Sequence, residues 1–219
     1  MTLLDFARGP AMNFALSLFI LGVLWRLIGT ALLNLRHLYS LPRKSRSASI
    51  LQGLITAGSR SWPHKEFIGR TGYGELLGYS YHIGLFIIIL AFAPHITFFK
   101  GLFGITWPAM PSTWIHIISV LTFTLMIAVI VRRLTHNVLR RLSNFDDYFS
   151  WFITCLVVVT GLMASGHMGG PYETLLALHL LSLEALLIWF PFGKLMHAFY
   201  IFPSRIANGY FLARKGAPS

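Results

Sequence analysis

Five long runs of apolar residues divide the chain, at about 11–35, 75–99, 113–131, 147–165 and 174–202. Each run is close to the roughly 20 residues that a helix needs to cross about 30 Å of hydrocarbon. The pattern predicts an all-α integral membrane bundle of five transmembrane helices. The first run lacks the basic flank and the small-residue cleavage site of a signal peptide, so we expect it to be retained.

The composition agrees with a membrane location, since 55% of the 219 residues are hydrophobic and 11% are charged. The polar loop 35–73 is either a docking surface or simply a basic linker. Nothing indicates a second soluble domain, so we expect residues 1–219 to form a single membrane domain. Because Cys155 is the single cysteine, the chain by itself holds no disulfide and no iron–sulfur cluster.

The formal net charge of +11 is concentrated in alternate loops. One side collects Arg36, Arg43, Lys44, Arg46, Arg60, Lys65, Arg70, Arg132, Arg133, Arg140, Arg141, Arg205, Arg214 and Lys215. The opposite side holds Arg8 and Lys100. The positive-inside rule therefore predicts an outer N-terminus and a cytoplasmic C-terminus. The expected location is the cytoplasmic (inner) membrane of a bacterium or archaeon. We interpret the basic residues as topology signals that contact anionic lipid, and not as a nucleic-acid site.

The nine histidines fall into two groups by their expected depth. Those in polar stretches, which we expect to be solvated, are His37, His64, His136 and His167. Those within or at the ends of the apolar runs are His82, His95, His116, His179 and His197. An ionisable group at membrane depth is costly and usually faces a partner or a cofactor.

His179 and His197 are eighteen residues apart in the fifth run. In one continuous helix this spacing is five turns, so both rings leave the same face about 27 Å apart. Two ligands at opposite ends of one stripe suit two stacked haems better than one compact metal centre. The topology pairs His82 with His197 on the inner side and His95 with His179 on the outer side. Each pair supplies two axial nitrogens to a low-spin b-type haem.

The second run fits this arrangement less closely. His82 and His95 are thirteen residues apart, which is about 20 Å of rise and roughly 220° of rotation in a regular helix. Pro94 and Pro191 are able to redirect the helix axes. His116 is a rival to His95 as the outer ligand.

Room for a flat macrocycle between helices is expected at Gly78, Gly84 and Gly161, since a missing side chain allows close approach. Two alternatives to a dihaem protein stay open. One is a monohaem cytochrome, and the other is a haem-free anchor, proton relay or transporter subunit.

Several short motifs are distributed over the five runs. They are HLLSLEALLIWFPFGKLMHAF from His179 to Phe199, YHIG around His82, LWR at 24–26, VRRL at 131–134 and TGLMA at 160–164. Together they resemble the gamma subunit of respiratory nitrate reductase. They also resemble the related cytochrome b subunits of heterodisulfide-reductase-like and dissimilatory-sulfite-reductase-linked complexes. The two histidines separated by seventeen residues, with Phe-Pro-Phe between them, are the specific part.

The resemblance implies a dihaem membrane anchor that exchanges electrons between quinol and an iron–sulfur partner subunit on the cytoplasmic side. It maps His82 and His197 onto the ligands of the inner haem, and His179 onto one ligand of the outer haem. The family's remaining ligand lies ten residues after the histidine of the HIG element, where this chain has Phe92. His95 is therefore a displaced candidate.

The resemblance also implies a quinol or menaquinol site beside the outer haem. Nitrate reductase uses a lysine near the start of the third span, whereas residues 111–116 of this chain read PSTWIH. Either Lys100 or His116 takes its place, or both are ordinary interfacial residues. Glu184, five residues after His179, either accepts a proton from quinol or hydrogen-bonds a neighbouring helix.

The expected function is thus the quinol-oxidising, or quinone-reducing, subunit of a larger oxidoreductase. Iron with two histidine ligands has no open position, so we expect no terminal substrate chemistry on this chain. Arg26 either reaches the headgroups or pairs with a haem propionate. Asp146 and Asp147 precede the fourth run and are expected to cap its helix.

Overall fold

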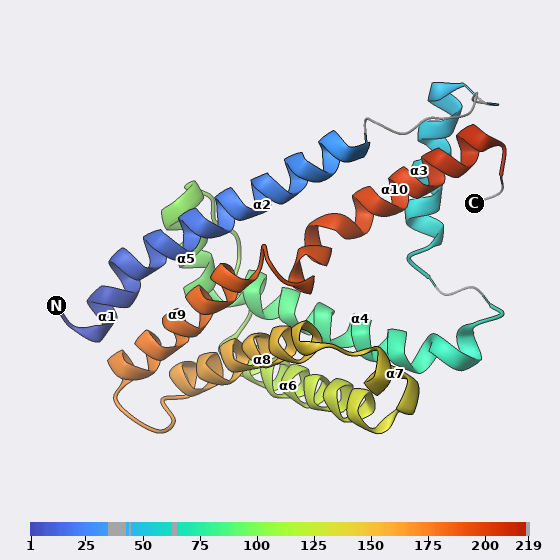
Figure 1. Ribbon diagram of the computed structural model, residues 1–219. Coiled ribbons are helices and arrows are strands. Elements are labelled where there is room, and N and C mark those ends of the chain that lie inside the picture. The colour runs from blue at the N-terminus through green and yellow to red at the C-terminus, as the bar shows by residue number, and fades with distance from the viewer. Residues whose placement is uncertain (35–42, 44, 63–64, 218–219) are drawn as a thin grey trace. The chain divides into compact units, whose positions relative to one another are not determined.

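A computed structural model of the chain describes residues 1–34, 43, 45–62 and 65–217. The predictions for Arg36, His37, Lys44 and His64 lie outside these residues. The described part is helical and contains no strand, which confirms the all-α fold class (Figure 1). Five of its helices are long and apolar enough to cross a membrane, at Leu3–Leu33, Ile68–Ala91, Ser112–Thr135, Phe145–Ser165 and Tyr172–Trp189.

The first span combines α1 (Leu3–Phe6), the π-helical turn η1 (Ala7–Ala11) and α2 (Met12–Asn34). The other spans are α4 (Ile68–Ala91), α6 (Ser112–Thr135), α8 (Phe145–Ser165) and α9 (Tyr172–Trp189). The remaining elements are α3 (Arg46–Ser59), α5 (Ala93–Phe103), α7 (Asn137–Leu142), the 3₁₀ turn η2 (Lys194–Met196) and α10 (His197–Lys215).

The second apolar run, expected as one helix over 75–99, breaks after Ala91. Phe92 has an extended backbone (φ −83°, ψ 127°), and Pro94 lies in the first turn of α5. A proline is tolerated there because the N–H groups of a first turn have no helical acceptor. His95 consequently lies on α5 and not on the membrane helix α4, so the rise and rotation expected between it and His82 do not apply.

The fifth run, expected as one helix over 174–202, is also interrupted. α9 ends at Trp189, Pro191 follows without an N–H to donate, and Gly193 is extended before η2. His179 lies on α9, whereas His197 is the first residue of α10. The prediction that both rings leave one face of a continuous helix is therefore wrong.

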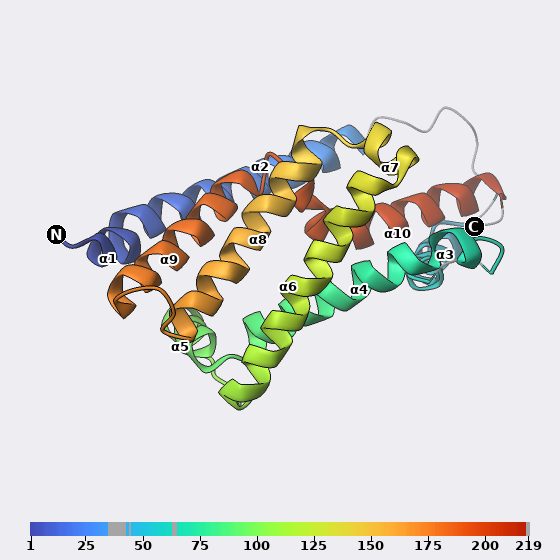
Figure 2. The ribbon, with the colours of Figure 1, turned by 90° about the horizontal axis from the view of Figure 1, so that it is seen from below.

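The chain forms two compact units, Met1–Ser17 with Tyr73–Ile188, and Leu18–Gly72 with Trp189–Ser219. In the first unit, α6 and α8 pack together and are joined through the short α7 (Figure 2). The Trp151 indole N–H donates to the Met126 carbonyl across this pair at 2.9 Å. α4 also approaches α6 closely, because a Cβ on Gly84 would collide with Thr122.

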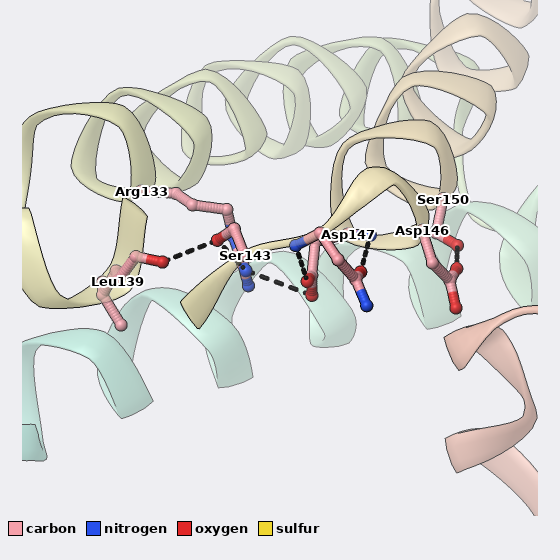
Figure 3. Close-up of polar contacts among 7 residues, drawn as sticks. Arg133, Leu139, Ser143, Asp146, Asp147 and Ser150 are labelled. Carbon is pink, nitrogen blue, oxygen red and sulfur yellow. Dashed lines mark hydrogen bonds and ion pairs between the residues drawn. The ribbon is translucent and has the colours of Figure 1, made fainter. Parts of the chain in front are cut away.

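Side chains on both sides of the α7–α8 connection define the start of α8 (Figure 3). The Asn144 side chain accepts from the Asp147 N–H, and the Asp147 carboxylate accepts from the Asn144 N–H at 3.0 Å. The same carboxylate pairs with Arg133 at 3.1 Å, and Asp146 accepts from the Ser150 hydroxyl at 2.7 Å. The expected capping of α8 is confirmed at Asp147, and Asp146 lies in the first turn of the same helix.

In the second unit, α3 and α10 form the most extensive contact between helices. The Arg43 N–H donates to the Arg214 carbonyl at 2.7 Å, and Arg205 donates to the Ser61 hydroxyl at 2.8 Å. These bonds join opposite ends of the two helices, so the pair is antiparallel. A Cβ on Gly209 would lie 2.5 Å from the Thr56 Cβ, which shows how closely the backbones approach.

The second unit also contains α2 residues from Leu18 onward. Phe19 packs edge-on against Phe190, with ring centroids 5.3 Å apart. The Tyr200 hydroxyl donates to the Arg26 carbonyl at 2.7 Å, while the Arg26 side chain is exposed. Large apolar side chains such as Leu21 are also exposed on this span, as a lipid-facing helix requires.

Candidate haem site

The break after α4 brings His95 close to His179 within the first unit. Their ring centroids are 6.3 Å apart and their planes differ by 24°. Metal–imidazole bonds are about 2 Å long, so two rings that hold one metal ion between their nitrogens have centroids about 6 Å apart. The observed centroid separation is close to this value. The predicted pairing of these two histidines therefore has the proximity that it requires.

His95 owes its position to the end of α4. The last four carbonyls of a helix accept no hydrogen bond from within the helix. His95 Nδ1 is 2.9 Å from one of them, the Ile88 oxygen. The Met110 N–H donates to another, the Ala91 oxygen, at 2.8 Å. The end of α4 is thus capped by residues that follow the break.

The bond to Ile88 also determines which nitrogen of His95 is left for a metal. A carbonyl only accepts hydrogen bonds, so Nδ1 carries the proton and Nε2 carries the lone pair. Burial lowers the pKa of His95 below its ordinary value, and the hydrogen bond to Ile88 opposes this shift only in part. The ring is therefore neutral at pH 7, which is the form that binds iron.

His179 is oriented by residues of α8 and by its own helix. Its Nδ1 lies 3.3 Å from the Thr160 hydroxyl, which is 2.8 Å from the Ser182 hydroxyl. Ser182 in turn donates to the His179 carbonyl at 2.7 Å. Such contacts to the second ring nitrogen fix the orientation of metal-binding histidines.

The three glycines expected to leave room have different surroundings. Gly161 lies against the imidazole of His179, where a Cβ would be 3.0 Å from Cε1. Gly84 instead lies against Thr122, and a Cβ on Gly78 would have no neighbour within 4 Å. Of the three glycines, Gly161 is therefore the one whose missing side chain leaves room for a histidine ring.

Phe92, where the resembled family has its histidine, packs edge-on against His95, with centroids 5.3 Å apart. The displaced histidine thus occupies the neighbourhood of the expected ligand. His116 is half-buried on α6, and its Nε2 is buried without a hydrogen-bond partner.

His82 and His197 share the local pattern of the other pair. His82 Nδ1 lies 2.7 Å from the Gly78 carbonyl, and His197 Nδ1 lies 2.8 Å from the Lys194 carbonyl. His82 belongs to the first unit and His197 to the second. Their pairing around an inner haem stays a prediction.

The remaining candidates differ in exposure. Lys100 is exposed near the end of α5. Glu184 is buried, with 4% of its surface exposed, and its Oε1 has no hydrogen-bond partner. His136 and His167 are both exposed, as expected for solvated histidines.

The described residues contain no cluster of three or more histidine, cysteine or carboxylate side chains that could hold a metal ion. A haem needs two axial ligands at most, because the porphyrin supplies the other four. Two histidines are therefore all the side-chain ligands that a haem would require. Sequence reasoning gave no role to Thr160 or Ser182, although Thr160 lies in the TGLMA motif and Ser182 one turn after His179.

The chain is similar to a protein of Nitratidesulfovibrio vulgaris (strain Hildenborough), described as "Protein". The two are 30% identical over 171 residues, which cover 77% of this chain and 73% of the relative. The chain belongs to the family of this relative. No protein-family model matches the chain. No solved structure matches this member of the family.

Proposed function

We propose that the chain is a b-type cytochrome subunit that transfers electrons between membrane quinone and an iron–sulfur partner subunit. The observation that carries the proposal is the near-parallel approach of His95 and His179, at 6.3 Å and 24°. Each ring has its Nδ1 engaged by an oxygen atom, which favours ligation through Nε2. Haem b held between these rings supplies reversible one-electron transfer.

The protein's own contribution is to hold and orient the ligands. Ile88 fixes the tautomer of His95, Thr160 fixes the ring of His179, and Gly161 allows α8 to approach that ring. His82 and His197 are the proposed ligands of a second, inner haem. Haems held by the two histidine pairs would supply a route for electrons across the hydrophobic layer.

We place the quinone site beside His116 in preference to Lys100. His116 Nε2 is buried without a partner, and a buried polar atom of this kind is costly unless a ligand satisfies it. A quinol hydroxyl donates a hydrogen bond to this nitrogen in the proposed complex. Glu184 is the proposed proton acceptor deeper in the membrane, since its Oε1 is likewise buried and unpartnered.

A terminal substrate reaction is assigned to other subunits. Quinol oxidation releases two protons and two electrons, and the electrons leave singly to the partner. The same ligands serve the reverse reaction, quinone reduction, when the partner supplies electrons. The proposed iron–sulfur clusters are assigned to the partner because each needs several cysteine ligands and this chain has one.

The first test is the optical spectrum of the purified full-length protein. We expect the sharp α band of low-spin haem b after dithionite reduction and two haems per chain. His95→Ala and His179→Ala should each retain one haem, whereas His116→Ala should retain both. A colourless wild-type protein would reject the proposal and favour a haem-free anchor or proton relay.

The quinone site is tested separately, by mixing a menaquinol analogue with the oxidised protein and following haem reduction. We expect His116→Ala to bind both haems but to require a higher quinol concentration for half-maximal rate. Lys100→Ala serves as the matched control and should behave as wild type. The reverse pattern would move the quinol contact to Lys100.

A further inference from the structure

α3 has two faces of contrasting chemistry. Its small residues Ser49, Gly53, Thr56 and Ala57 are buried, and at Gly53 and Thr56 the contact is with α10. Small residues at this spacing allow two helices to approach closely. This face of α3 is therefore already occupied by a helix of the same unit.

A different face of α3 carries four large aliphatic residues. Their exposed fractions are 45% at Ile50, 60% at Leu51, 54% at Leu54 and 51% at Ile55. Residues three and four positions apart share one side of a helix, so the four form a continuous aliphatic face. A contiguous exposed apolar face of this kind marks an interaction surface.

Basic and aromatic residues border this aliphatic face. Arg46 is the first residue of α3, Arg60 is its C-cap, and Trp62 and Lys65 lie in the segment that follows. All four side chains are exposed, Trp62 by 71%. Arginine, lysine and tryptophan at the margins of an apolar face are typical of helices that lie in a membrane interface.

The charge of the whole second unit favours an anionic surface. Its described residues contain ten lysines and arginines, which are Arg26, Arg43, Arg46, Arg60, Lys65, Arg70, Lys194, Arg205, Arg214 and Lys215. Glu66 is the single acidic residue in the described part of this unit. Basic residues close to a membrane are attracted to its anionic lipids.

Chain connectivity keeps α3 close to the bilayer. Eight residues separate Ser59, the end of α3, from Ile68, the start of a membrane span. Even a fully extended connection of that length reaches only about 30 Å. A lipid surface is therefore within reach of the aliphatic face without any other protein.

We propose that α3, held against α10, lies in the headgroup region of an anionic membrane leaflet. Ile50, Leu51, Leu54 and Ile55 enter the boundary of the acyl chains, and the flanking Arg46, Arg60 and Lys65 contact lipid phosphates. This inference is independent of whether the chain binds haem. A protein partner on the same face is the competing occupant, and the experiment below separates the two.

The test uses the full-length protein with its single cysteine replaced, Cys155→Ser, and a nitroxide attached at Leu54→Cys. The protein is reconstituted into vesicles of phosphatidylcholine with 30% phosphatidylglycerol, or of phosphatidylcholine alone. Collisions of the label with oxygen, which dissolves in lipid, are compared with those of a water-soluble nickel complex. Asn208→Cys, an exposed polar position on α10, is the matched control.

We expect the Leu54 label to collide several-fold more with oxygen than with nickel in anionic vesicles, and the Asn208 label to show the reverse. The preference at Leu54 should fall in neutral vesicles and with Arg46→Gln and Arg60→Gln combined. Leu51→Cys repeats the measurement on the same face if Leu54→Cys does not fold. A water-exposed label at both aliphatic positions overturns the proposal, and protection from both reagents overturns it in favour of a protein contact. Equal results in the two kinds of vesicle overturn the anionic requirement.

Discussion

At the scale of single residues, the four histidines proposed as haem ligands share one local feature. Each places Nδ1 within 3.3 Å of an oxygen atom, which belongs to a carbonyl in three cases and to the Thr160 hydroxyl in the fourth. A hydroxyl can donate as well as accept, and the contact at His179 is the longest of the four. Among these four contacts, the one at His179 is therefore the one that a side-chain substitution can remove.

Replacing Thr160 with valine should weaken haem binding at the outer site and leave haem binding at the inner site unchanged. The substitution keeps the shape of the side chain but removes the oxygen atom that faces His179 Nδ1. Loss of such a supporting contact typically costs about 10–100-fold in metal affinity. Haem titration of Thr160→Val should show this loss at one of two sites.

The control for Thr160→Val is Thr124→Val, which removes an exposed hydroxyl bonded within α6 to Val120. Its haem affinity should equal that of wild type. If both variants bind haem as tightly as wild type, Thr160 does not support the ligand.

A side chain at Gly161 should displace His179. An added Cβ would lie 3.0 Å from Cε1 and 3.3 Å from Nδ1 of that ring, closer than ordinary contact. We expect Gly161→Val to lower the haem content by one per chain, measured by the pyridine haemochrome assay. Gly29→Val, at a membrane-helix position with open space, should keep the wild-type content. Full haem content in Gly161→Val would place the outer haem elsewhere.

At the scale of elements, the α3–α10 pair depends on glycines that face the opposite helix. A Cβ on Gly209 would lie 2.4 Å from the Thr56 hydroxyl oxygen, and one on Gly53 would lie 2.7 Å from the Ile206 carbonyl oxygen. Gly209→Val should therefore separate the helices, at a cost of about 1–3 kcal/mol for overpacking. Hydrogen exchange of residues 46–59 should become faster.

The matched control for this prediction is Gly58→Val, because a Cβ on Gly58 has no neighbour within 4 Å. Its exchange rates should match those of wild type. Unchanged exchange in Gly209→Val would show that the two helices tolerate a wider separation.

Composition and periodicity were sufficient to predict the five membrane helices, because burying backbone polar groups in lipid requires helices of that length. They were not sufficient to place the two helix breaks. Pro94 and Pro191 were recognised as able to redirect an axis, but a proline in an apolar run either kinks a helix or ends it. The outcome depends on what caps the freed carbonyls, here His95 and Met110.

The sequence predicts the candidate site only in part, because the site depends on where the helices break. His95 and His179 were paired by their expected depth, and the structure brings them together. The eighteen-residue spacing of His179 and His197 does not place both rings on one helix face, since the intervening segment is not one helix. Thr160 and Ser182 could not be assigned, because a hydroxyl within an apolar run most often bonds to its own helix.

At the scale of the whole molecule, the distribution of arginine and lysine predicts which end faces the cytoplasm. An odd number of crossings places the two termini on opposite sides, and the basic loops should be retained inside. A green fluorescent protein fused after Ser219 should fluoresce in a bacterial host, and alkaline phosphatase fused at Pro108 should be active. The opposite result for both fusions would invert the orientation.

Helical hydrogen bonding is interrupted between Trp189 and Lys194, so a change in chain length there alters the register of neither α9 nor α10. An insertion inside a regular helix rotates all later side chains by about 100° per residue, whereas an insertion in this bend leaves the registers of α9 and α10 intact. We therefore expect homologues to keep both His179 and His197 even where the two are separated by one residue more or fewer. Gaps placed at 190–193 are the sensible choice when such sequences are aligned.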